Sequence, residues 1–65
     1  MLSLKIARIK KGLNQEQLSK ISGVGRPTIS RLESGKQKPE KTKMEILIKL
    51  SNALGMTVKE LFSVN

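Results

Sequence analysis

Residues 15–34 read QEQLSKISGVGRPTISRLES, and this stretch decides how the chain folds. Its apolar residues recur at intervals of three and four, which is the spacing of one helix face and not the alternation of a strand. The pattern predicts one helix over residues 15–22 and a second over residues 27–34, joined by a short turn. The side chains expected to face the core are Leu18, Ile21, Val24, Ile29 and Leu32.

Small and restricted residues mark the turn between these two helices. Gly23 ends the first helix, because glycine readily adopts the left-handed backbone found at helix C-termini. Ser19 is small enough to let two helices cross steeply at close approach. Pro27 fits the first turn of the second helix, where a backbone N–H would have no partner. The residue before proline avoids helical geometry, so either Gly25 or Arg26 is the N-cap.

Three more helices are predicted outside this stretch, at residues 3–11, 43–54 and 58–62. Asn14 is expected to cap the helix over residues 15–22. Thr42 with Glu45, and Thr57 with Glu60, have the spacing of a capping box at the start of the last two helices. The predicted fold class is therefore all-α, a compact bundle of five short helices.

The buried faces of the outer helices follow from the same periodicity. On the helix over residues 3–11, we expect a core stripe of Leu2, Ile6, Ile9 and Leu13, with Leu4 and Ala7 on its flank. On the helix over residues 43–54, we expect a core face of Met44, Leu47, Ile48, Leu50 and Leu54.

Length and composition limit what the chain can do. Its 65 residues predict one small domain over residues 1–65 with a single core. The sequence contains no cysteine and no histidine, so disulfides, zinc sites and the common nucleophile and acid–base sets are not expected. We therefore predict a protein that is not an enzyme, with no metal, no cofactor and no evident small-molecule ligand.

Membrane insertion is not expected either. No apolar run approaches the roughly 18 residues that a membrane-spanning helix needs, and the first residues lack the apolar core of a signal peptide. The sequence therefore predicts a soluble, cytoplasmic protein without a membrane partner.

The positive charge of the chain is concentrated in two segments. The formal net charge is +8 at pH 7. Residues 1–12 hold four basic side chains and no acidic one, and residues 26–43 hold six basic side chains against two acidic ones. Basic residues gathered in this way indicate a polyanionic partner such as nucleic acid.

The stretch at residues 15–34 resembles the helix-turn-helix of the phage repressor and Cro family. In that family a small residue falls five positions along the motif and a glycine nine along, and here these are Ser19 and Gly23. The segments GLNQEQL, LESGK and LIKLSNALGMTVKELF extend the likeness over nearly the whole chain, although the loop after Gly35 is about three residues longer than is usual. The resemblance implies a lambda-repressor-like DNA-binding domain.

The resemblance also implies roles for individual residues. The helix over residues 27–34 is expected to lie in the major groove of DNA. The residues expected to face bases are Arg26, Pro27, Thr28 and Arg31, with the DNA backbone as an alternative for Arg26. Those expected near phosphates are Asn14, Gln15, Lys36, Lys38 and Arg8. Arg31 is the sharpest candidate, because its planar fork can donate to guanine O6 and N7 together. Arg8 and Glu33 stand where the family commonly has a structural ion pair.

The expected partner is a palindromic double-stranded operator bound by a homodimer, because one reading helix contacts too few base pairs for useful specificity. The candidates for the dimer contact are Met56, Val58, Leu61, Phe62 and Val64, some of which must fill the core instead. The predicted function is that of a transcriptional regulator, most commonly a repressor in this family.

One alternative stays open from the sequence. The same fold also serves as an antitoxin-type or protein-interaction module, in which the bundle grips another protein. An RNA or single-strand binder is disfavoured, because the chain has one aromatic residue, Phe62, on which a base could stack.

Overall fold

The computed structural model describes residues 2–62, and every regular element in this part of the chain is helical. The order is α1 (Leu2–Lys10), α2 (Gln15–Ser22), α3 (Arg26–Ser34), the short 3₁₀ helix η1 (Pro39–Lys41), α4 (Met44–Ala53) and α5 (Val58–Phe62). The predicted all-α class is confirmed. The 3₁₀ turn in the long loop was not expected from the sequence.

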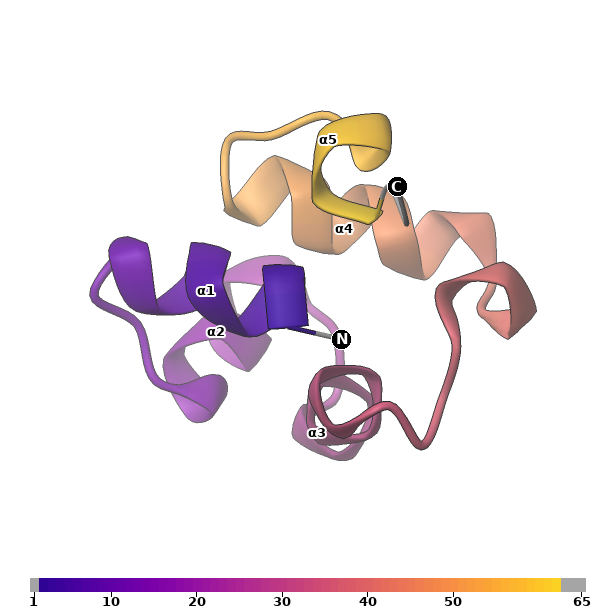
Figure 1. Cartoon of the computed structure of the whole chain (residues 1–65). Coiled ribbons are helices and arrows are strands. Elements are labelled where there is room, and N and C mark those ends of the chain that lie inside the picture. The colour runs from indigo at the N-terminus through magenta and orange to yellow at the C-terminus, as the bar shows by residue number, and fades with distance from the viewer. Residues whose placement is uncertain (1, 63–65) are drawn as a thin grey trace.

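The helices form a small bundle in which α3 and the α4–α5 pair lie at opposite ends. Figure 1 shows α3 at the bottom of the molecule, α4 and α5 at the top, and α1 and α2 between them. Helix α2 packs against both α3 and α4, and α1 packs against α3 and α5. Helix α3 is therefore attached to the rest of the protein through α1 and α2.

One hydrophobic core joins all five α-helices. Its buried members are Leu4, Leu18, Val24, Ile29, Leu32, Leu47, Leu50, Leu54, Leu61 and Phe62. The sequence correctly assigned the inner face of the helix-turn-helix, since Leu18, Val24, Ile29 and Leu32 are all buried.

The predicted core stripe of α1 is wrong at Ile6 and Ile9, whereas Leu13 packs against the core as expected. Ile6 and Ile9 are exposed, whereas Leu4 is fully buried. Leu4 and Arg8 are four residues apart and share one helix face, and that face is the one turned inward. Arg8 takes part in an ion pair there, so the isoleucines lie outside. The expectation for the side chain of Leu2 falls outside the described side chains.

The predicted core-facing sides of α2 and α4 included residues that the structure leaves exposed. Leu18 of α2 is buried but Ile21 is exposed, and in α4 Leu47, Leu50 and Leu54 are buried but Met44 and Ile48 are exposed. A domain with one small core lets each helix bury only one narrow side, so apolar residues beside that side remain in water.

The turn between α2 and α3 combines a left-handed glycine with a serine contact. Gly23 has φ 77°, and its N–H donates to Ser19 O at 2.9 Å, which ends α2. The Ser19 hydroxyl donates to Val24 O at 2.6 Å, while the Val24 side chain is buried. Ser19 therefore satisfies a carbonyl of the turn as well as leaving room for the crossing helix.

Two of the predicted helix starts had different outcomes. At α5 the capping box is confirmed, because Thr57 N donates to Glu60 Oε1 at 2.9 Å and Glu60 N donates to Thr57 Oγ1 at 3.0 Å. At α4 the prediction is wrong, because the N-cap is Lys43 without a side-chain cap. The Thr42 hydroxyl is instead engaged with Lys38 O, on the other side of η1.

The position of Leu4 and Ile9 on α1 gives a direct test of the core. Leu4 is 0% exposed and Ile9 is 55% exposed. Leu4→Ala is expected to lower the free energy of unfolding by about 2–5 kcal/mol, because it leaves a cavity in a packed core. Ile9→Ala is expected to change it by no more than about 0.5 kcal/mol. Urea denaturation followed by circular dichroism measures both, and equal effects would contradict the observed orientation of α1.

Candidate nucleic-acid interface

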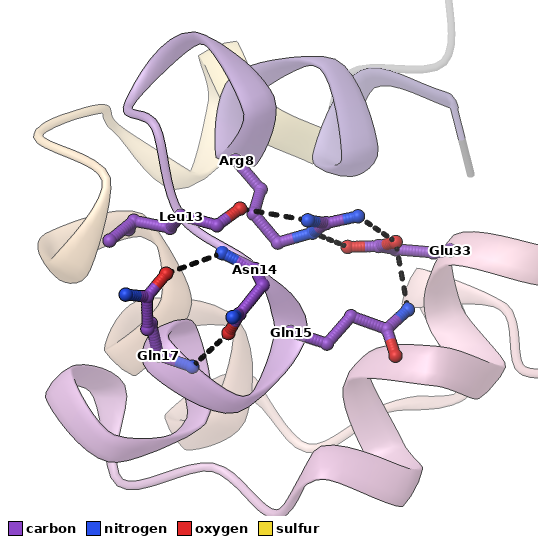
Figure 2. Close-up of polar contacts among 6 residues, drawn as sticks. All are labelled: Arg8, Leu13, Asn14, Gln15, Gln17 and Glu33. Carbon is purple, nitrogen blue, oxygen red and sulfur yellow. Dashed lines mark hydrogen bonds and ion pairs between the residues drawn. The ribbon is translucent and has the colours of Figure 1, made fainter.

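Helix α2 begins with a two-way cap around Asn14. The Asn14 side chain accepts from Gln17 N at 2.7 Å, and the Gln17 side chain accepts from Asn14 N at 2.8 Å, as Figure 2 shows. The predicted capping role of Asn14 is confirmed. Gln17 completes the box, and its spacing of three residues from Asn14 was a signal that the sequence already carried.

The predicted pair of Arg8 and Glu33 is formed and has a forked geometry. Arg8 Nε donates to Glu33 Oε2 at 2.7 Å, and Arg8 Nη2 donates to Glu33 Oε1 at 3.0 Å. The two side chains are 10% and 5% exposed. Arg8 Nη1 also donates to Leu13 O at 2.8 Å, so the guanidinium joins α1, the α1–α2 turn and α3 (Figure 2).

Gln15 is the third member of this cluster. Its Nε2 donates to Glu33 Oε1 at 3.1 Å, which connects the first residue of α2 to the end of α3 (Figure 2). A single carboxylate therefore receives donors from two other helices. The position of α3 against α1 and α2 is set by directional bonds as well as by packing.

The surroundings of the pair shift both ionisation equilibria. Burial by itself would raise the pKa of Glu33, but hydrogen bonds from Arg8 and Gln15, with the charges of Arg8 and Lys5, outweigh it and lower that pKa. The hydrogen bond with Glu33 raises the pKa of Arg8. Both groups are held in their charged forms, which is the state in which the pair stabilises the fold.

The burial of Arg8 bears on the phosphate contact expected of it. All three guanidinium nitrogens donate inside the protein, which leaves little of the side chain for a DNA backbone. Only 9% of the residue is exposed. Arg8 acts as a structural residue here.

The outer side of α3 carries the residues expected to face bases. Arg26, Pro27 and Arg31 are exposed, and Thr28 is half-buried. Gly25 is the N-cap of α3 and Arg26 is its first residue, which settles the choice left open by the sequence. The helix thus starts in the register that the resemblance implied.

Arg31 is not freely extended into solvent. Its Nε donates to Gln37 Oε1 at 3.1 Å and its Nη2 donates to Thr28 Oγ1 at 3.3 Å. Lys36 and Lys38, on either side of Gln37, are both exposed. The loop after α3 therefore supplies a partner for Arg31 between two basic side chains.

Sequence reasoning missed Gln37 and Thr42 in this loop. Gln37 Nε2 donates to Thr42 Oγ1 at 2.9 Å, and the backbone N–H of Gln37 donates to Arg31 O at 3.1 Å. Neither contact follows a spacing rule, because the chain first reverses at Gly35, where φ is 84°. No motif in the sequence marked Gln37, and the motif that included Thr42 was the capping box expected with Glu45.

Other kinds of site find little support in residues 2–62. No group of three or more His, Cys, Asp or Glu side chains gathers there to hold a metal ion. None of the helices in this part of the chain is long and apolar enough to cross a bilayer.

Two helices that cross at a glycine turn, with an anchored second helix exposing polar and basic residues, define a helix-turn-helix domain. The helix-turn-helix family model matches residues 4–61, and the chain belongs to this family of DNA-binding regulators, in its Cro and phage-repressor type. A protein of Haemophilus influenzae, named an uncharacterized HTH-type transcriptional regulator, is 38% identical over 64 positions, which cover 86% of this chain and 62% of that protein. The chain thus spans less than two thirds of that relative. No solved structure matches this chain.

The buried pair predicts a large cost for removing one partner. Glu33→Ala leaves the Arg8 guanidinium without its counter-charge in a nearly closed site, so it is expected to lower the free energy of unfolding by on the order of 3 kcal/mol. Glu16→Ala is the matched control, because Glu16 pairs with Lys20 at 3.9 Å on the open surface and should change stability by under about 0.5 kcal/mol. Thermal unfolding at pH 7 compares the two, and similar melting temperatures would overturn the structural role of the pair.

The pH dependence of stability in the wild type and in a further variant, Glu33→Gln, gives the sign of the effect. The folded-state pKa of Glu33 lies below its unfolded value of about 4.3. The contribution of Glu33 is therefore fully present above about pH 4.3 and is lost as the pH falls through the folded pKa. The difference in melting temperature between the wild type and Glu33→Gln should shrink in that range.

Proposed function

We propose that this chain is a sequence-specific, double-stranded DNA-binding transcriptional regulator that inserts α3 into the major groove. The observation that carries the proposal is the arrangement of α3, which is anchored from within by Glu33 and presents Thr28 and Arg31 on its outer side. The major groove of DNA is wide enough to admit an α-helix, and the surrounding positive charge favours contact with phosphates.

The base-facing residues divide by chemistry. Arg31 would donate to guanine O6 and N7, and Thr28 would donate to or accept from a base edge. Arg26, at the first turn of α3, would reach an adjacent base. Pro27 has no N–H to donate and would offer an apolar contact to a thymine methyl group.

The phosphate contacts would come from both sides of α3. Asn14 and Gln15 lie at the N-terminus of α2, where free backbone N–H groups and the helix dipole favour an anion. The Gln15 side-chain amide donates one hydrogen to Glu33, so its second hydrogen remains for a phosphate oxygen. Lys36 and Lys38 would approach the backbone from the loop.

We also propose that the chain binds a palindromic operator as a homodimer and acts by occupying it, most simply as a repressor in the cytoplasm. Leu61 and Phe62 belong to the core, so they have little surface for a dimer contact. Met56 and Val58 are partly buried and stay candidates, while Val64 lies outside the described residues. Met56 and Ile6 line one groove of about 400 Å³ between α1 and the α4–α5 turn, which could extend the contact.

The main test separates residues that contact bases from residues that contact phosphates. Arg31→Ala is expected to cost about 1–3 kcal/mol on the operator and to flatten the preference at one base pair per half-site. Lys38→Ala is expected to weaken specific and random duplexes alike and to reduce the slope of log affinity against log salt by about one per phosphate contact. Titrations on the operator, a single-base variant and an unrelated duplex separate the two patterns. Equal weakening of all three duplexes by Arg31→Ala would remove Arg31 from base reading.

The dimer has its own test in the turn between α4 and α5. Met56→Glu places a charge in the proposed apolar contact and is expected to shift the protein toward monomer and weaken palindrome binding. Ile21→Glu is the control, because Ile21 is an exposed isoleucine of α2 outside that contact. Sedimentation equilibrium, with and without a palindromic duplex, measures the stoichiometry. One protein per palindrome, bound no more tightly than an isolated half-site, would sink the proposal.

A further inference from the structure

Arg31 is held by a residue that lies outside the helix-turn-helix. Its guanidinium donates to the Gln37 side chain at 3.1 Å and to the Thr28 hydroxyl at 3.3 Å. Thr28 is one turn away on the same helix, but Gln37 belongs to the loop that follows α3. The direction of the Arg31 side chain therefore depends on where that loop puts an acceptor.

The loop fixes Gln37 at both its backbone and its side chain. The backbone N–H of Gln37 donates to Arg31 O at 3.1 Å, across the reversal at Gly35. The side-chain Nε2 donates to Thr42 Oγ1 at 2.9 Å. Gln37 is half-buried, so it is better held than a residue at the tip of an open loop.

The hydrogen bonds form a chain with one direction. The carbonyl of Lys38 can only accept, so the Thr42 hydroxyl, 2.8 Å away, donates its hydrogen to it. The lone pairs of that hydroxyl then accept from the Gln37 amide nitrogen. This places the Gln37 amide oxygen, an acceptor, against Arg31 Nε. A flipped amide would set a donor against the Nε–H and an acceptor against the committed hydroxyl, so one orientation is favoured.

This series of hydrogen bonds restrains the Arg31 side chain and leaves several of its N–H donors available. A guanidinium has five N–H groups. The bonds to Gln37 and Thr28 use the N–H of Nε and one N–H of Nη2. Both N–H groups of Nη1 and one of Nη2 remain for a partner. A guanine edge offers two neighbouring acceptors, O6 and N7, in the major groove. A restrained side chain with two adjacent donors left over suits that edge and loses less freedom on binding.

We propose that Gln37 is a positioning residue that sets base specificity through Arg31 without touching a base, and that Thr42 fixes the amide orientation on which this depends. The proposal rests on the base-reading role of Arg31 proposed above. It makes the loop after α3 a determinant of specificity in its own right, separate from the phosphate contacts of Lys36 and Lys38.

The test measures discrimination, not affinity alone. The wild type first selects its preferred duplex from a random pool, and Arg31→Ala identifies the base pair whose preference depends on Arg31. The affinity ratio between the preferred duplex and its variant at that pair is then measured for the other proteins. Gln37→Met keeps the side-chain length but removes the amide, and is expected to lower the ratio by roughly three- to tenfold. Thr42→Val is expected to lower it in the same direction.

Rescue and control variants separate positioning from general damage. Gln37→Glu keeps an oxygen acceptor opposite Arg31 Nε, so its ratio is expected to stay closer to that of the wild type than the ratio of Gln37→Met. Lys38→Ala alters the same loop and is expected to weaken both duplexes equally with an unchanged ratio. Thermal unfolding of each variant checks that the fold persists. A wild-type ratio in Gln37→Met, with a lowered ratio in Arg31→Ala, would overturn the role of Gln37 and leave the proposed function standing.

A measurement on the free protein tests the hydrogen-bond chain independently of DNA. In ¹⁵N NMR spectra, the Nε–H of Arg31 is expected to exchange with water more slowly than that of Arg26, an exposed arginine at the start of the same helix. The difference is expected to disappear in Gln37→Met. Equal exchange for the two arginines in the wild type would overturn the inference, whether or not the protein binds DNA.

Discussion

The fork between Arg8 and Glu33 is the constraint on which the rest of the domain depends. It joins residues 25 positions apart and lies where α1, α2 and α3 come together. Arg8 Nε is 2.7 Å from Glu33 Oε2, and Arg8 Nη2 is 3.0 Å from Glu33 Oε1. Apolar contacts from Ile29 and Leu32 hold α3 close to the core, but such contacts are non-directional and leave the helix some freedom to rotate about its axis. A two-pronged charged contact, extended by Gln15, removes that freedom. The rotation of α3 decides which side chains face outward, so the pair determines the composition of the candidate DNA surface without belonging to it.

Helix α3 is held differently on its two sides. A helix of nine residues is marginal in water by itself, so its inner side needs strong anchors, and it has a buried ion pair together with Ile29 and Leu32. Its outer side carries exposed hydrogen bonds from Arg31 to Gln37 and Thr28. Exposed bonds of this kind contribute little to stability, because water competes for both partners. They orient Arg31, while the ion pair and the buried side chains keep the helix in place.

The sequence predicted local features well and failed where a feature depends on tertiary contacts. Ser19, Gly23 and Val24 specify a turn within six residues, and the structure has that turn. The inner face of α1 could not be read from periodicity, because Ile6 and Ile9 look more apolar than the Leu4 and Arg8 face that is buried. Only the distant Glu33 makes a buried arginine favourable at that position. The Thr42 cap failed for a related reason, since its hydroxyl bonds to Lys38 O and Gln37, and not to the first turn of α4.

The long loop after α3 shows why the outer network lay beyond sequence reasoning. This loop contains the 3₁₀ turn η1. That turn places Thr42 beside Lys38 O and within reach of the Gln37 amide. Without the Thr42 hydroxyl, none of the described bonds would fix which end of the Gln37 amide faces Arg31. The loop therefore acts on α3 itself, because Arg31 is held by Gln37 of the loop as well as by Thr28 of its own helix.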